Sequence, residues 1–235
     1  MTKRKKNCAF VLSSIAIFVV MVVIYLSNIR EGVNLLVAFG TVGMTLIIVY
    51  IEIIRHWLRK PEIKIEFANE RPYCRHARTT TDSRPYYCHF VVVNNSPSQA
   101  DDCEAVLEKI WDWKKKRLGW QERKNFIPVN LKWSAENPKE DFERACFKTI
   151  YPGGREYFCD IGSVREWDKV VEFVFVLIRP FVSQADFLLP GKYKIQISVY
   201  SKNAANVTKK FDVEWLGGWS EKQQDMQERL KIEML

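Results

Sequence analysis

The chain has 235 residues, of which 27% are charged, with 36 Lys and Arg against 28 Asp and Glu and a net charge of +8. Residues 1–60 hold eight basic and two acidic residues, whereas residues 61–235 hold 28 and 26, so the positive excess lies at the N-terminus. This distribution excludes a strongly basic nucleic-acid-binding domain and instead suits attraction to anionic lipid headgroups.

Two uncharged, mostly apolar runs, Asn7 to Ile29 and Val33 to Ile51, predict a pair of transmembrane helices. Each is long enough for a bilayer core about 30 Å thick, which takes about 20 apolar residues. The linker Arg30 to Gly32 is short enough to leave only a tight hairpin. Basic residues flank both outer ends, and positive residues stay on the cytoplasmic side. We therefore expect residues 1–60 to form a two-span hairpin of a multi-pass cell-membrane protein, with the N-terminus and the remaining chain in the cytoplasm.

Beyond Pro61 the sequence changes to short alternating segments separated by turn residues. Residues of this kind, rich in Val, Ile and aromatics, are typical of strands in an all-β domain. We expect one β-sandwich over residues 61–218. Its strand-like segments are Glu62 to Phe67, Tyr86 to Asn94, Ala105 to Trp113, Phe126 to Trp133, Glu156 to Val164, Val170 to Ile178, Tyr193 to Tyr200 and Val207 to Trp215.

The turn Pro190–Gly191 leads into a strand whose first aromatic residue is Tyr193. In Ig-like sandwiches, a Tyr at the start of a late strand hydrogen-bonds the backbone of the preceding loop and forms a tyrosine corner. Tyr193 is our candidate for this role. The alternative is an ordinary hairpin turn with a half-buried Tyr.

The pattern of the β region resembles uncharacterised prokaryotic membrane-anchored proteins with a cytoplasmic Ig-like domain. The residues that carry the resemblance lie between residues 86 and 200, about half of the chain. They are Phe90 to Asn95, Gln99, Ala100, Cys103 to Leu107, Leu131 to Trp133 and Ile150 to Gly153. The resemblance implies an Ig-like fold and a scaffolding or binding role, and it assigns no functional residue.

Six cysteines are present, five of them within residues 61–235, and we expect most of these to be reduced and buried. Cys74, His76, Cys88 and His89 are candidate zinc ligands by residue type. Their spacing matches no zinc knuckle, and Cys88 and His89 are neighbours in a predicted strand, where successive side chains point to opposite faces. No nucleophile motif accompanies them. We expect no metal, no cofactor and no catalytic residue.

The segment from Trp111 to Lys124 combines clustered cations with three tryptophans. Such a hairpin tip can lie in lipid headgroups or contact a partner. The alternative is a solvated loop with Trp111 or Trp113 turned into the core. The candidate membrane or partner contacts are Lys114, Lys115, Lys116, Arg117 and Trp120.

Residues 219–235 predict a C-terminal amphipathic helix. Ser220 and Gln223 have the spacing of a capping box, and Met226, Leu230 and Met234 then fall on one helical face. This helix either packs on the sandwich or offers a narrow apolar stripe to a partner.

Two function classes follow from these features. The first is a membrane-anchored binding or scaffolding module that presents the sandwich to an unknown protein partner or small ligand. The second is a membrane effector or sensor whose transmembrane hairpin forms homo-oligomers when the β domain binds a ligand. Gly40 and Gly43 in the second span would let such helices approach closely.

Overall fold

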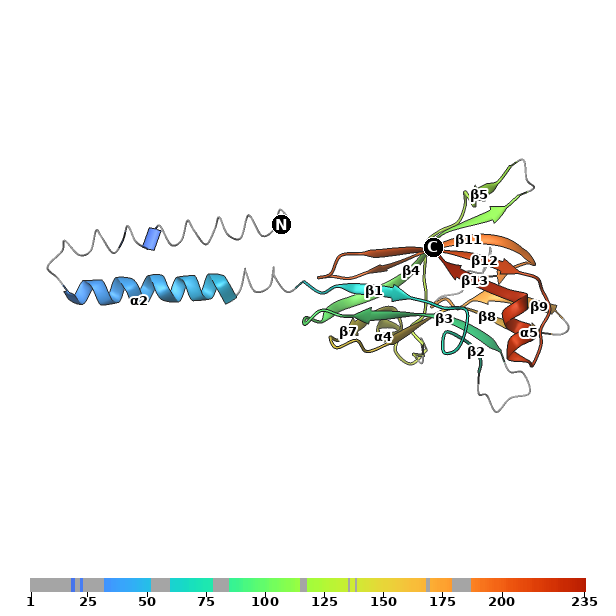
Figure 1. Cartoon of the computed structure of the whole chain (residues 1–235), viewed down its shortest axis with the longest axis horizontal. Helices are drawn as coiled ribbons and strands as arrows, with labels where there is room; N and C mark the ends of the chain where they lie inside the picture. The colour runs from blue at the N-terminus through green and yellow to red at the C-terminus, as the bar shows by residue number, and fades with distance from the viewer. Residues whose placement is uncertain are drawn as a thin grey trace. The chain divides into compact units, whose positions relative to one another are not determined.

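The computed structural model describes residues 18–19, 22, 32–51, 60–77, 85–114, 118–134, 136–137, 139–167, 170–178 and 187–235. The chain divides into two compact units, Met1–Leu58 and Arg59–Leu235. Figure 1 shows helix α2 in the first unit and all of the strands in the second.

The expected two-span hairpin is not found. Helix α2, Gly32–Val49, has 18 residues. No helix within the described part of the chain is long and apolar enough to cross a membrane. Of the first expected span, the structure describes only Phe18, Val19 and Val22. The prediction of a two-span transmembrane hairpin is therefore wrong, and so is the multi-pass location in the cell membrane that was based on it.

The second unit contains two antiparallel sheets. The first sheet has six strands in the order β1-β3-β8-β9-β10, and β2 pairs with β3 beside β1. Its strands are β1 (Ile63–Glu66), β2 (Cys74–His76), β3 (Tyr86–Asn94), β8 (Tyr157–Trp167), β9 (Val170–Phe175) and β10 (Phe187–Leu188).

The second sheet has seven strands in the order β13-β12-β11-β4-β5, and both β6 and β7 pair with other parts of β4. Among the described residues, two short helices, α4 (Phe142–Cys146) and α5 (Gln223–Arg229), accompany the sheets. The strands of the second sheet are β4 (Ala100–Trp113), β5 (Trp120–Glu122), β6 (Val129–Asn130), β7 (Lys148–Ile150), β11 (Gly191–Tyr200), β12 (Val207–Trp215) and β13 (Leu230–Met234).

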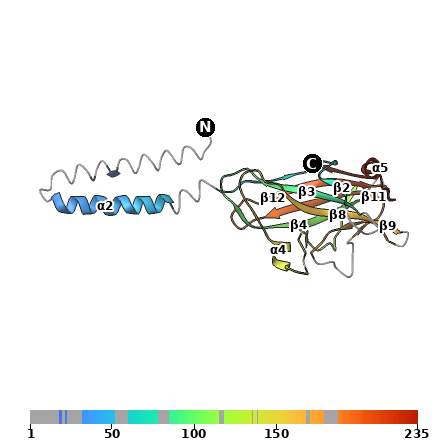
Figure 2. The same ribbon diagram turned by 90° about the horizontal axis from the view of Figure 1, so that it is seen from below.

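The core lies between the inner faces of these sheets, because alternate residues of each strand point inward. Ile195 and Ile197 of β11 and Phe211 of β12 are fully buried from one side, and Phe90 of β3 and Ile161 of β8 from the other. The β-sandwich prediction is confirmed, and Figures 1 and 2 show the strands of this unit from two directions.

The strand order differs from the expected Ig-like one. In a constant-type Ig domain, strands C, F and G form one sheet, and β4, β11 and β12 follow this order here. In the other Ig sheet, strand B pairs with strand E, and strand D, which precedes E in the sequence, lies on the far side of E. Here β3 pairs with β8, and β9, which follows β8 in the sequence, lies on the far side of β8. The Ig-like part of the fold prediction therefore does not hold for the first sheet.

A crossing segment, residues 129–134, connects the two sheets. Val129 and Asn130 pair with β4 as strand β6. Farther along the same segment, Trp133 forms a β-bridge with Cys159 of β8. The Lys132 carbonyl accepts a hydrogen bond from the Asp160 N–H at 2.9 Å. One short extended segment thus hydrogen-bonds both layers of the sandwich.

The tyrosine corner is confirmed. The Tyr193 hydroxyl donates a hydrogen bond to the Leu189 carbonyl at 2.8 Å, and the Tyr193 side chain is buried. Gly191 lies under the ring, where an added Cβ would be 3.2 Å from the Tyr193 hydroxyl oxygen. A side chain at position 191 would therefore make a tight contact with the Tyr193 ring and hydroxyl.

The expected helix over residues 219–235 is shorter than predicted. Helix α5 ends at Arg229, and the chain continues as strand β13, which pairs with β12. Leu230 and Ile232 are buried in alternation with exposed residues, the period of a strand. Gln223 donates to the Cys74 carbonyl at 2.8 Å, so it does not complete the predicted capping box. The tail packs on the sandwich, which is the first of the two alternatives predicted for it.

Replacing Tyr193 by Phe removes the donor to the Leu189 carbonyl and leaves the ring in place. We expect the free energy of unfolding to fall by about 1–2 kcal/mol, because a carbonyl loses its partner. Urea unfolding measures this loss. The matched control is Tyr151→Phe, since Tyr151 is half exposed, and it should change stability by less than about 0.5 kcal/mol. Equal effects of the two substitutions would contradict the corner.

Candidate functional site

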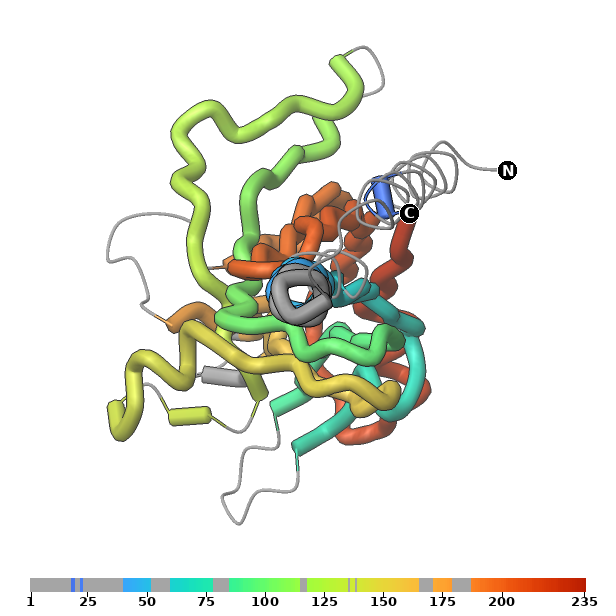
Figure 3. Tube along the Cα trace, turned by 90° about the vertical axis from the view of Figure 1, so that its left-hand side faces the viewer, coloured from blue at the N-terminus to red at the C-terminus, as the bar shows by residue number. Residues whose placement is uncertain are grey.

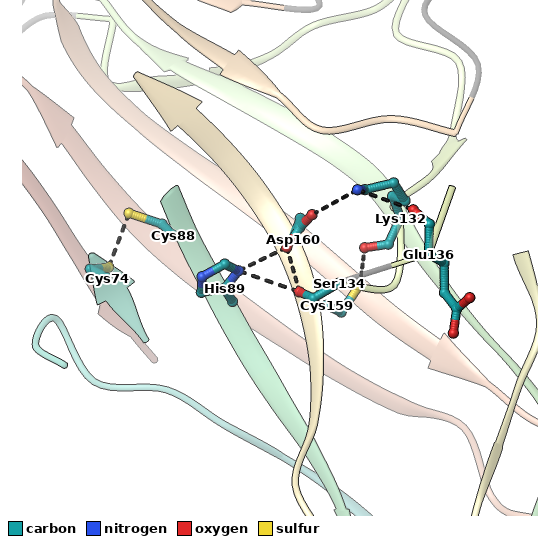
Figure 4. Close-up of polar contacts among 8 residues, drawn as sticks. All are labelled: Cys74, Cys88, His89, Lys132, Ser134, Glu136, Cys159 and Asp160. Carbon is teal, nitrogen blue, oxygen red and sulfur yellow. Dashed lines mark hydrogen bonds and ion pairs between the residues drawn. The ribbon is translucent and has the colours of Figure 1, made fainter. Parts of the chain in front are cut away.

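A polar cluster of four residues, His89, Lys132, Ser134 and Asp160, lies where β3, β8 and the crossing segment meet (Figure 4). His89 and Asp160 are direct register partners on β3 and β8. The crossing segment places Lys132 and Ser134 on the opposite side of β8 from His89. His89 and Asp160 are both buried although both are polar.

The Asp160 carboxylate is the centre of this cluster. Its Oδ1 atom lies 2.8 Å from His89 Nδ1 and accepts a hydrogen bond from the Ser134 hydroxyl at 2.5 Å. Its Oδ2 atom lies 3.5 Å from Lys132 Nζ. Burial favours the neutral acid, but the hydrogen bonds from His89 and Ser134 and the Lys132 charge outweigh it, so the pKa of Asp160 is lowered. The cluster therefore holds a buried carboxylate in its charged form.

The residue types match a Ser-His-Asp triad, but the geometry does not. In a triad, one ring nitrogen of His faces Asp and the other accepts the Ser proton. Here the Ser134 hydroxyl donates a hydrogen bond to Asp160. The Ser134 Oγ atom lies 3.4 Å from His89 Nδ1, the same ring nitrogen that contacts Asp160. His89 Nε2 is buried and has no hydrogen-bond partner among the described residues. Ser134 is therefore not activated as a nucleophile, and the cluster attaches the crossing segment to the first sheet.

The four candidate zinc ligands are not brought together. Cys74 and Cys88 face each other inside the core with their sulfurs 3.0 Å apart, while His89 contacts Asp160. The His76 ring packs against Tyr86, with ring centroids 5.1 Å apart. Among the described residues, no three His, Cys, Asp or Glu side chains are grouped to hold a metal ion.

The predicted partner-contact segment forms a two-stranded ribbon of β4 and β5 that stands away from the sandwich (Figure 3). Lys114 and Trp120 are described and exposed, whereas Lys115, Lys116 and Arg117 lie outside the described residues. Trp113 is the register partner of Trp120, and their ring centroids are 5.1 Å apart. These two side chains remain 41% and 37% exposed.

Trp111 extends this pair into a tryptophan platform, defined as Trp111, Trp113 and Trp120. Lys210 Nζ lies 5.3 Å from the Trp111 ring centroid, and Lys194 Nζ lies 4.9 Å from the Trp120 ring centroid. Such contacts between an ammonium and an indole face are attractive. None of the three rings is buried in the core, so the alternative that Trp111 or Trp113 turns inward does not hold.

The base of the ribbon is fixed to the tyrosine corner. Arg123 forms a two-pronged ion pair with Asp112, with Nη2 2.8 Å from Oδ1 and Nε 2.9 Å from Oδ2. The Arg123 guanidinium also lies 5.5 Å from the Tyr193 ring centroid. Planar Arg pairs of this kind are geometrically specific. Arg123 lies within the predicted segment from Trp111 to Lys124 but was not among the candidate contacts, and Lys194 was missed because only the strand register brings β11 to the ribbon.

The comparisons with known proteins give no identity. No family model matches the sequence, and neither the curated proteins nor the solved structures contain a match. Function is therefore inferred from the geometry of the described residues.

Replacing Asp160 by Asn should lower the free energy of unfolding at pH 7 by about 3 kcal/mol, because it removes a buried carboxylate that His89, Ser134 and Lys132 contact. The pKa of Asp160 is lowered in the folded state, so its charge stabilises the fold above the unfolded value of about 3.9. That contribution is lost as the pH falls through the lower folded value. Urea unfolding at several pH values should show the difference from wild type narrowing below about pH 4.

The matched control is Asp102→Asn, because the Asp102 side chain is 59% exposed and its oxygen is 3.8 Å from Lys202 Nζ. This substitution should change stability by less than about 0.5 kcal/mol. If the difference in unfolding free energy between Asp160→Asn and wild type did not depend on pH, the charge of the carboxylate would not be what stabilises the cluster.

Proposed function

We propose that the chain is a non-enzymatic binding module and that the ribbon with its tryptophan platform is the contact surface. The observation that carries this proposal is the cross-strand pair of Trp113 and Trp120, two large aromatic side chains that remain exposed on a projecting ribbon. Exposed Trp side chains are enriched among residues that dominate binding energy. Folding alone does not require two indoles in this position.

The platform is held in place before any partner arrives. Lys194 stacks on Trp120 from a neighbouring strand, and the Arg123–Asp112 ion pair fixes the ribbon base. Side chains that are already ordered lose less conformational entropy on binding. This preorganisation supports a role in recognition.

Charge indicates the chemistry of the partner. Residues 109–124 include seven Lys and Arg against two Asp and Glu. Such an excess attracts an acidic surface and raises the association rate. The near balance of 28 basic and 26 acidic residues over residues 61–235 argues against nucleic acid. The proposed partner is therefore an acidic protein surface. The alternative effector function required the transmembrane hairpin and is not carried further.

The proposal is tested by photo-crosslinking in cells that express the full chain. A benzophenone amino acid replaces either Lys114 on the ribbon or Lys139, an exposed residue away from it. We expect a defined protein adduct from position 114 only, with a crosslinked peptide rich in Asp and Glu. In the double variant Trp113→Ala/Trp120→Ala, the adduct should fall more than about tenfold, as expected for central aromatic contacts.

Urea unfolding of the double variant controls for folding, since both side chains are partly exposed. Equal adduct yields from positions 114 and 139, or an undiminished yield in the double variant, would refute the assignment of the ribbon as contact surface.

A further inference from the structure

Two buried thiols, those of Cys74 on β2 and Cys88 on β3, face each other in the described core. Their sulfur atoms are 3.0 Å apart, and both side chains are completely buried (Figure 4). They are direct register partners in an antiparallel pair of strands. The pairing of β2 with β3, rather than closeness in the sequence, brings the two sulfur atoms together.

The backbone geometry of this pair suits a disulfide bond. The His89 N–H bonds to the Tyr73 carbonyl at 2.8 Å, and the Ala77 N–H bonds to the Pro85 carbonyl at 2.9 Å. Hydrogen-bonded positions alternate along antiparallel strands, so Cys74 and Cys88 occupy a non-hydrogen-bonded position between them. At such positions the Cα atoms are about 4.5 Å apart, within the range of disulfides. The sulfurs need to approach by only about 1 Å to reach a bonded distance.

We propose that Cys74 and Cys88 are a thiol pair that forms a reversible cross-strand disulfide by exchange with a low-molecular-weight disulfide. One thiolate attacks the small disulfide and releases its first thiol. The second thiolate then attacks the mixed disulfide and releases the other thiol. The pair loses two protons and two electrons, and the small disulfide is reduced to two thiols.

The other described cysteines that are held by backbone contacts lack such a partner sulfur. The Cys103 thiol donates to the Ala100 carbonyl at 3.6 Å, and the Cys159 thiol donates to the Lys132 carbonyl at 3.4 Å. Both are as buried as Cys74 and Cys88. They therefore serve as internal controls for burial without sulfur contact.

Local opening at β2 gives the small disulfide access to the pair. Strand β2 has three residues and pairs only with β3 among the described strands. Burial raises the pKa of the Cys88 thiol, which makes the closed state unreactive. Once formed, the disulfide would tie β2 to β3 and with it the Gln223 side chain, which donates to the Cys74 carbonyl.

The test treats the full chain with excess oxidised glutathione at pH 8 and then alkylates the remaining thiols in denaturant. Mass spectrometry of the digest should show one linked peptide pair containing Cys74 and Cys88, two hydrogen masses below the reduced pair. Cys103 and Cys159 should remain alkylated. Dithiothreitol should reverse the link, and the oxidised protein should unfold at a higher temperature than the reduced protein.

The variant Cys88→Ser removes one sulfur, and its folding is checked by thermal unfolding. In this variant the linked peptide should be absent and oxidation should no longer raise the unfolding temperature. The proposal would be overturned if Cys74 and Cys88 were still alkylated after the oxidation step. It would also be overturned if each carried glutathione and no disulfide linked them. Linkage of Cys103 or Cys159 as readily as of Cys74 would also overturn it.

Discussion

The backbone pairing of residues 129–134 with both sheets is the constraint on which the rest of the β unit depends. The Leu131 N–H bonds to the Ala105 carbonyl of one sheet, and the Ser134 N–H bonds to the Phe158 carbonyl of the other. Between them, Trp133 is buried and its indole donates to the Cys146 carbonyl at 3.2 Å. This pairing is what brings Lys132 and Ser134 to Asp160. A buried carboxylate on β8 is tolerable because His89 of β3 and these two residues of the crossing segment supply its partners.

Local patterns predicted the longer strands and missed the short strands β2, β5, β7, β10 and β13. The segments Tyr86–Asn94 and Val207–Trp215 match β3 and β12 at both ends, because alternation of side chains is a local signal. Tyr193 was predictable for the same reason, since its hydroxyl reaches a carbonyl only four residues upstream. The polar cluster was not, because His89 and Asp160 are 71 residues apart and meet only through register.

The two ends of the chain show where pattern reasoning fails. In the tail, Met226, Leu230 and Met234 fit a helical period, but Leu230 and Ile232 also fit a strand period, and pairing with β12 decides between the two. At the N-terminus, apolar composition predicts two spans. Helix α2 covers Gly32–Val49, and no helix of the described residues is long and apolar enough to cross a membrane, so composition alone does not establish a span. On the ribbon, sequence located Trp120, whereas its partner Lys194 comes from β11.

Strand β4 also has a mechanical consequence. It runs from its pairing with β7, past the crossing segment, to the ribbon. It is paired with β11 from Glu104 to Asp112, with one register shift between Gln196 and Ile197. Its hydrogen bonds to β11 lie perpendicular to the strand direction. A pulling force applied to the ribbon along β4 would therefore load these bonds in shear, all at once. A force applied across the strand would instead peel them apart one after another, so the module resists tension in one direction far more than in the other.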